Sequence, residues 1–136
     1  SDWSPPMLEM IAAILLLTGP KGQSLASYGP DWEHIQPGGW TVVSVDGGGD
    51  TMLLTQAVEG HSSRLWIREE RSFYRESRRT LYEFDCNQGR ARPLRVDNHR
   101  EPNLGGEADT STNDRPWVDL WPDSFVEIAS REICGR

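Results

Sequence analysis

The residues of this chain whose chemistry is easiest to define are its two cysteines, Cys86 and Cys134. Neither lies in a CxxC pair, and no histidine stands at the spacing of a zinc site, so a disulfide is favoured over a metal centre. In the chain-entropy model such a bond would contribute on the order of 4 kcal/mol to stability. In a reducing compartment the same residues would instead be two buried thiols.

Residues that act as acids, bases or nucleophiles form no recognisable constellation. His34, His61 and His99 share no motif spacing, and no GxSxG stretch is present. Glu69 and Glu70 would point to opposite faces of a strand, where two carboxylates cannot act together as acid and base. We therefore predict that the protein is not an enzyme. A small hydrolase that uses His61 or His99 with a nearby aspartate is a minor hypothesis.

The stretch DGGGD, Asp46–Asp50, resembles the beginning of a calcium-binding loop. Counted from Asp46, the twelfth position is Ala57, where an EF-hand loop needs a bidentate glutamate, and the flanking residues have a strand pattern. The stretch therefore indicates a hairpin turn, and we expect neither a metal nor a cofactor.

Charge is unevenly distributed along the 136 residues, whose formal net charge is −7. An acidic chain does not favour general nucleic-acid binding, because phosphate neutralisation needs a surplus of basic side chains. Residues 60–100 nevertheless hold ten arginines against six acidic residues. Such a strip suits acidic protein or glycan partners. Cross-strand Arg–Glu pairs on solvated strand faces would explain it without any partner.

Strand patterns dominate the middle of the chain. Alternating or β-branched runs are separated by glycine-containing turns, which is typical of consecutive antiparallel strands. Pro93 removes one ladder hydrogen bond and so indicates an edge strand or a bulge. Residues 71–79 fit a strand extension, a loop or a short helix equally well and stay unassigned. The expected strands cover residues 40–46, 50–58, 62–70, 80–86 and 90–97.

The end of the chain predicts a long polar loop and then a helix. Residues 98–115 contain almost no apolar side chain. Ser124 and Glu127 form a capping-box pattern, and apolar residues then recur on one stripe, so we predict a helix over 125–133. The fold class is therefore α+β, an antiparallel meander of about 4–6 strands with a C-terminal helix packed on one face.

The first 39 residues stand apart from this pattern. An apolar run, Met10–Leu17, is followed by Ser24 and Ala26 at the −3 and −1 positions of a signal-peptide cleavage site, although no basic residue precedes the run. A helix capped by Ser4 is the alternative. The run is too short to span a bilayer. We divide the chain into a signal peptide or helix, a Pro/Gly-rich linker and a folded domain, at residues 1–26, 27–39 and 40–136.

The order of these motifs resembles the surface-adhesin protein E family of bacterial envelope proteins. The resemblance covers about residues 40–134 and is carried best by LYEFDC at 81–86 and by the terminal helix from Ser124 to Cys134. It implies an antiparallel sheet whose C-terminal helix is held by a disulfide. It also implies export to the periplasm or the cell surface, and attachment to extracellular or envelope proteins, host matrix proteins included.

Arginine and aromatic side chains are the candidate contact residues, since Trp, Tyr and Arg dominate binding hot spots. Trp40, Trp66, Trp117 and Trp121 can instead be core or helix-clamping residues. We predict an exported, non-enzymatic binding domain; an inhibitor or accessory factor of an envelope enzyme, with residues 98–115 entering a cleft, is the alternative. The oligomeric state cannot be derived from the sequence. The candidate binding residues are Arg64, Trp66, Arg68, Arg71, Tyr74 and Arg75.

Overall fold

The computed structural model describes residues 25–46 and 50–135. All but the last two residues of the expected signal peptide or helix at 1–26 lie outside the described residues, as does the glycine turn at 47–49. The chain divides into two compact units, residues 1–34 and 35–136. In the first unit, the described residues form two 3₁₀ helices, η1 (Leu25–Tyr28) and η2 (Pro30–Trp32). No helix in the described parts of the chain is both long and apolar enough to cross a membrane.

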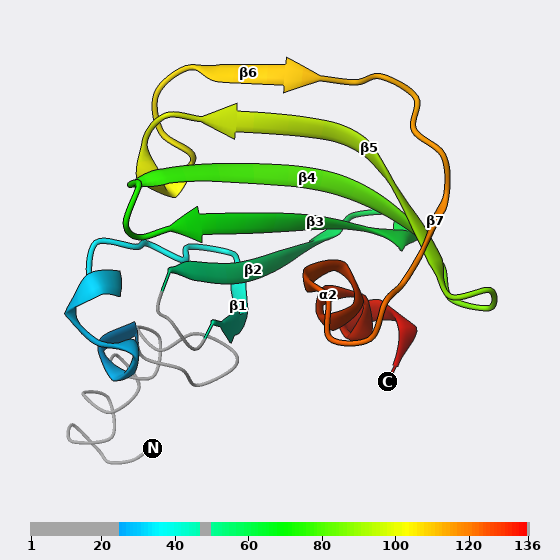
Figure 1. Ribbon diagram of the computed structural model, residues 1–136, viewed down its shortest axis with the longest axis horizontal. Coiled ribbons are helices and arrows are strands. Elements are labelled where there is room, and N and C mark those ends of the chain that lie inside the picture. Colours follow the sequence, from blue (N-terminus) through cyan, green and yellow to red (C-terminus); the bar gives the residue numbers. More distant parts are fainter. Residues whose placement is uncertain (1–24, 47–49, 136) are drawn as a thin grey trace, which may run out of the picture. The chain divides into compact units, whose positions relative to one another are not determined.

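The second unit is built on one antiparallel sheet with a C-terminal helix, as predicted. Consecutive strands pair in the order β1-β2-β3-β4-β5-β6, and the short β7 also pairs with β5 (Figure 1). The meander follows from alternating half-buried patterns joined by short turns. The strands are β1 (Thr41–Val45), β2 (Thr51–Val58), β3 (His61–Arg71), β4 (Glu76–Asp85), β5 (Arg90–His99), β6 (Ala108–Ser111) and β7 (Val118–Asp119).

Two stretches differ from a simple sequence-based assignment. Residues 71–79 supply the end of β3, a turn at residues 72–75 and the start of β4. The polar loop expected at 98–115 is partly wrong, because it contains η3 (Pro102–Leu104) and β6. β6 pairs with β5 through backbone hydrogen bonds at the sheet edge, so it forms although Ala108 is its single apolar residue.

Pro93 lies at a bulge, one of the two alternatives that its position predicted. Leu81 pairs with Arg95 and Tyr82 with Pro93, so β5 carries one extra residue between them. On its other edge, β5 pairs with β7 at residues 90–91 and with β6 at residues 96–99. The proline, which has no N–H to donate, therefore falls between the two partner strands.

The C-terminal helix α2 (Phe125–Cys134) begins at the predicted cap. Ser124 accepts a hydrogen bond from the backbone N–H of Glu127 at 3.3 Å. The Glu127 carboxylate accepts the backbone N–H of Asp123 at 2.9 Å, one residue before the cap. Gly135 ends the helix with a φ of 73°, a left-handed conformation that glycine adopts without a steric cost.

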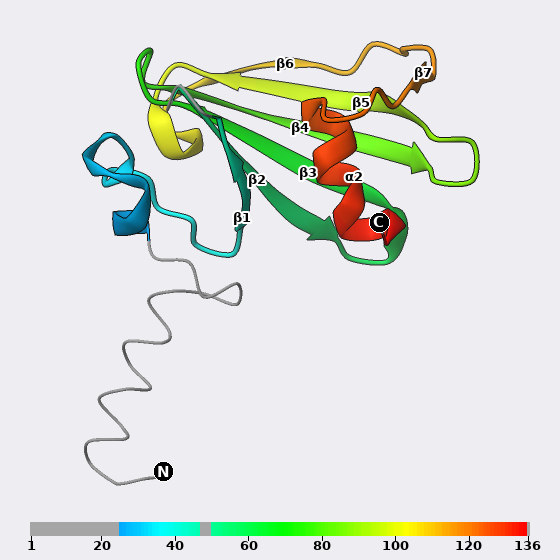
Figure 2. The ribbon, with the colours of Figure 1, turned by 60° about the horizontal axis from the view of Figure 1, so that its bottom comes forward.

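The helix crosses one face of the sheet and covers the main core (Figure 2). Leu65 and Ile67 of β3 are buried in this core, and Ala129 enters it from α2. The predicted disulfide is present: Cys86, just after β4, is joined to Cys134 at the end of α2, with an S–S distance of 1.98 Å. The bond therefore fixes the end of the helix to the central part of the sheet.

Candidate binding site

The six predicted binding residues are distributed over three parts of the second unit. Because Leu65 and Ile67 point into the core beneath α2, the alternating residues Arg64, Trp66 and Arg68 point to the opposite face of β3. Arg71 ends the strand on the α2 side. Tyr74 and Arg75 lie in the turn between β3 and β4.

Arg68 is buried and has a structural role, with only 2% of its surface exposed. Its Nε donates to Glu70 at 2.6 Å, and both terminal nitrogens donate to the carbonyl oxygen of Gln36 at 3.2 Å. Asn103 completes the cluster, since its side-chain oxygen accepts from Arg68 at 2.9 Å and its backbone N–H donates to Glu70. The Arg68–Glu70 pair therefore holds the segment that precedes β1 and the η3 segment against the sheet. Arg68 is not accessible to a partner.

The turn between β3 and β4 exposes two large aromatic side chains. Phe73 is 79% exposed and Tyr74 is 60% exposed, and their rings meet edge to face with centroids 5.2 Å apart. The guanidinium of Arg71 lies 4.3 Å from the Tyr74 ring centroid. Arg75 adopts a φ of 52° and donates its backbone N–H to the carbonyl of Arg71, which closes the turn. We call Arg71, Phe73, Tyr74 and Arg75 the hairpin tip.

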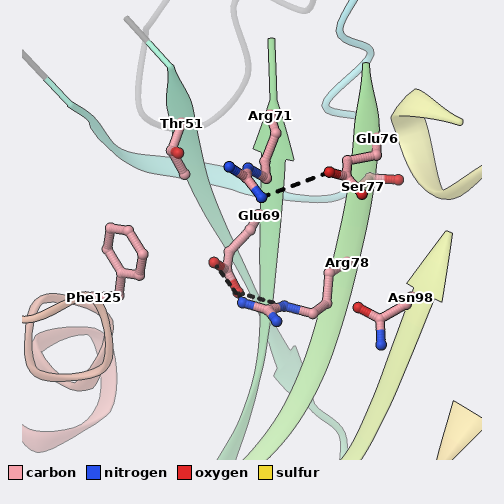
Figure 3. A pocket seen from close by; sticks show the side chains of 8 residues that line it. All are labelled: Thr51, Glu69, Arg71, Glu76, Ser77, Arg78, Asn98 and Phe125. Carbon is pink, nitrogen blue, oxygen red and sulfur yellow. Dashed lines mark hydrogen bonds and ion pairs between the residues drawn. The ribbon is translucent and has the colours of Figure 1, made fainter. Parts of the chain in front are cut away.

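A hollow of about 290 Å³ lies between the hairpin end of the sheet and the start of α2 (Figure 3). Arg78 binds the Glu69 carboxylate through Nε and a terminal nitrogen, at 3.0 and 2.8 Å. Arg71 lies 3.6 Å from Glu76 on the same side. Phe125, the first residue of α2, lines the hollow on the helix side. The hollow is therefore mainly polar, and Arg71 connects it to the hairpin tip.

The face of β3, β4 and β5 that points away from α2 carries a set of arginines that sequence reasoning found only in part. Arg64 was predicted, whereas its neighbours on β4 and β5 were not singled out. Side-chain alternation places Arg79 and Glu83 on this face of β4, whereas on β5 the bulge beside Pro93 brings Arg92 and Arg95 to the same face. We call the following residues the arginine face: Arg64, Trp66, Arg79, Glu83, Arg92, Arg95 and Asp97.

Each acid of the arginine face bridges two arginines. Glu83 lies 3.7 Å from Arg64 and 2.8 Å from Arg92, across β3, β4 and β5. Asp97 accepts from Nε of Arg79 at 2.7 Å and from Nε of Arg95 at 3.0 Å. Each cluster of two arginines and one acid therefore keeps a formal charge of +1.

Trp66 and Trp117 lie under arginines rather than in the main core. The guanidinium of Arg79 is 4.2 Å from the Trp66 ring centroid, and that of Arg92 is 4.6 Å from Trp117. Such stacking holds a guanidinium in place through cation–π attraction. Trp121, by contrast, is 73% exposed.

Asp97 has a strongly lowered pKa. Burial of its carboxylate would raise the pKa, but hydrogen bonds from Thr110, Arg79 and Arg95 outweigh burial and lower the pKa to about 2. The carboxylate therefore stays charged well into the acid range and keeps both arginines oriented.

This lowered pKa predicts an acid-dependent loss of stability. Because the folded pKa is below the ordinary value of 3.8, the stabilisation is complete above about pH 5 and declines as the pH falls through 3.8 towards 2. We expect Asp97→Asn to be less stable than the natural chain by roughly 2 kcal/mol at pH 6. Urea unfolding should show a smaller stability difference between the natural chain and the variant at pH 2.5 than at pH 6. An equal difference at both pH values would contradict the lowered pKa of Asp97.

The histidines of the second unit do not come together. Because β3 and β5 run in the same direction, His61 at the start of β3 and His99 at the end of β5 lie at opposite ends of the sheet. The Nδ1 of His99 is 3.1 Å from the carbonyl oxygen of Gly105. In the part of the chain that the structure describes, no group of three or more His, Cys, Asp or Glu side chains is arranged to hold a metal.

Comparison with protein families identified a match over most of the chain. A family model described as "Surface-adhesin protein E" matches residues 40–135, which run from the residue before β1 to the glycine that ends α2. The matched region therefore contains the whole sheet, the helix and both cysteines. Searches of curated proteins and of solved structures gave no match.

Proposed function

The chain belongs to the Surface-adhesin protein E family, and from this premise we propose that it is an exported domain whose hairpin tip binds an extracellular or envelope protein. Family membership supports an adhesin-like surface protein without enzymatic activity. The disulfide supports export, since such bonds persist in oxidising compartments such as the periplasm and the cell surface.

The observation that carries this proposal is the exposure of Phe73 and Tyr74 at the hairpin tip. Two adjacent aromatic rings in water are unfavourable unless a partner covers them, and buried aromatic anchors flanked by arginine are typical binding hot spots. The edge-to-face contact between the rings and the stacking of Arg71 on Tyr74 limit their motion. A partner would therefore bind the tip at a small cost in side-chain entropy.

The adjoining hollow gives the tip a polar border. A protein that covers Tyr74 would place its neighbouring residues near Arg71 and the Arg78–Glu69 pair. Apolar anchors surrounded by polar groups are the usual arrangement of a protein–protein interface. The hollow itself is too polar to serve as the anchor, which favours a protein surface over a small apolar ligand.

The proposal predicts that Phe73→Ser/Tyr74→Ser abolishes or strongly weakens binding. Surface plasmon resonance would compare the natural chain and this variant over a panel of purified host extracellular-matrix proteins. We expect at least one protein to bind the natural chain, with a loss of tenfold or more in the variant, because truncating a hot spot costs about 2 kcal/mol or more.

Trp121→Ser is the matched control, since it removes an equally exposed aromatic ring outside the tip. The control should bind like the natural chain. Equal binding by the natural chain and the tip variant would contradict the proposal. Binding that instead depends on residues 98–115, together with co-purification of one envelope enzyme at fixed stoichiometry, would favour the inhibitor alternative.

A further inference from the structure

We propose that the arginine face binds a linear acidic polysaccharide through the sulfate or carboxylate groups of its sugars. This surface lies on the side of the sheet that points away from α2, and the inference is independent of binding at the hairpin tip. The two bridged clusters, centred on Glu83 and Asp97, carry it.

One cluster spans three neighbouring strands, and the other spans two of the same strands. Arg64 on β3 is opposite Glu83 on β4, and Glu83 is opposite Arg92 on β5. Asp97 on β5 is opposite Arg79 on β4. Neighbouring strands are about 4.8 Å apart, so positive groups are repeated at short intervals across the sheet. A chain with regularly repeated negative groups is complementary to this arrangement.

The arginines keep hydrogen-bond donors for a ligand. Arg79 and Arg95 both bind Asp97 through Nε. Among the described residues, their terminal nitrogens make no hydrogen bond, and a guanidinium edge of this kind matches the paired oxygens of a sulfate or carboxylate. The side chains of Arg64, Arg79, Arg92 and Arg95 are each between 33% and 44% exposed.

The guanidinium groups are also held in place before a ligand arrives. Trp66 and Trp117 stack against Arg79 and Arg92, and the acids bind the inner edges of the arginines. A flexible arginine loses rotamer entropy when it binds an anion, and this loss is smaller for a side chain that is already fixed. The face is therefore a preorganised anion surface.

The chemistry of this face fits a polysaccharide better than a protein. The centre of a protein–protein interface is depleted of charge and contains apolar anchors. The arginine face consists mainly of arginines and acids, and its Trp66 ring lies under the guanidinium of Arg79. The exposed aromatic anchors Phe73 and Tyr74 lie at the hairpin tip instead. A hydrated polyanion needs no apolar anchor, and it can contact the locally positive face of a chain whose net charge is −7.

Arg64→Gln/Arg95→Gln is the most informative variant. Each substitution removes one arginine of a cluster, while Glu83 keeps Arg92 and Asp97 keeps Arg79, so no acid is left without a partner. Arg78→Gln/Arg100→Gln is the charge-matched control, because Arg78 faces α2 and Arg100 follows the end of β5. Calorimetric titration of the full chain would use heparin as the sulfated probe, dextran as the neutral probe and a poly-dT oligonucleotide as the phosphate probe.

We expect heparin to bind the natural chain and the control equally, and the Arg64/Arg95 variant to bind about tenfold more weakly, since two exposed charge contacts are lost. Binding should weaken as salt is raised from 50 to 300 mM. Dextran should not bind. The proposal is overturned if heparin does not bind, if both variants lose affinity equally, or if poly-dT binds as tightly as heparin. Loss of heparin binding in the Phe73/Tyr74 variant would also contradict it.

Discussion

Replacing Glu70 with glutamine is expected to lower the free energy of unfolding by about 3–5 kcal/mol, because the change leaves the charge of Arg68 buried without its counter-ion. The side chain of Arg68 is 3% exposed and that of Glu70 is 0% exposed, and Nε of Arg68 lies 2.6 Å from the Glu70 carboxylate. The carboxylate also accepts the backbone N–H of Asn103. Urea unfolding followed by tryptophan fluorescence would measure the loss.

The neighbouring pair provides the control for this prediction. Glu69→Gln removes the partner of Arg78, but that pair is at the surface, so the expected loss is below about 1 kcal/mol. The double variant Arg68→Met/Glu70→Gln should recover part of the stability lost in Glu70→Gln, because the unpaired buried charge is gone. A similar loss of stability for Glu69→Gln and Glu70→Gln would contradict the prediction that Glu70 stabilises the buried charge of Arg68. No recovery of stability in the double variant would also contradict it.

Removing the disulfide with Cys86→Ser/Cys134→Ser is expected to lower the free energy of unfolding by about 4 kcal/mol. The two cysteines are 48 residues apart, and the bond restricts the unfolded chain over that whole span. In the folded state it fixes the last turn of α2, whose Ala129 is fully buried in the core. Loss of the bond should therefore also increase amide exchange at the C-terminal end of α2.

Reduction of the natural chain supplies an independent measurement of the same effect. Thermal unfolding with and without dithiothreitol should reproduce the stability difference between the natural chain and the double serine variant. The serine variant itself should not respond to dithiothreitol. A disulfide-free chain that is as stable as the oxidised chain would show that packing alone holds α2 on the sheet.

The fold was predictable wherever side chains alternate between core and solvent. The central strands and the capped C-terminal helix follow from local patterns, and the disulfide was favoured because neither cysteine lies in a metal-binding motif. The turn at residues 72–75 was not predictable, because it contains neither Gly nor Pro and places Arg75 in a left-handed conformation. β6 was missed for a different reason: it is polar and depends on pairing with β5.

The binding residues were harder to assign than the fold, because burial depends on contacts between distant segments. Arg64 and Arg68 have the same alternation and the same residue type, yet only Arg68 is buried. Its burial depends on Gln36 and Asn103, which lie 32 and 35 residues away in the sequence. The arginine face likewise combines three strands, and no local motif reports which arginines share an acid.

Hydrogen–deuterium exchange would show directly whether the hairpin tip is the protein-binding surface. The exchange of the full chain would be compared alone and in complex with the extracellular-matrix protein of the panel that binds it most tightly. We expect the backbone amides of residues 72–75 to gain the greatest protection. Protection confined to other parts of the chain, with residues 72–75 exchanging as in the free protein, would contradict it.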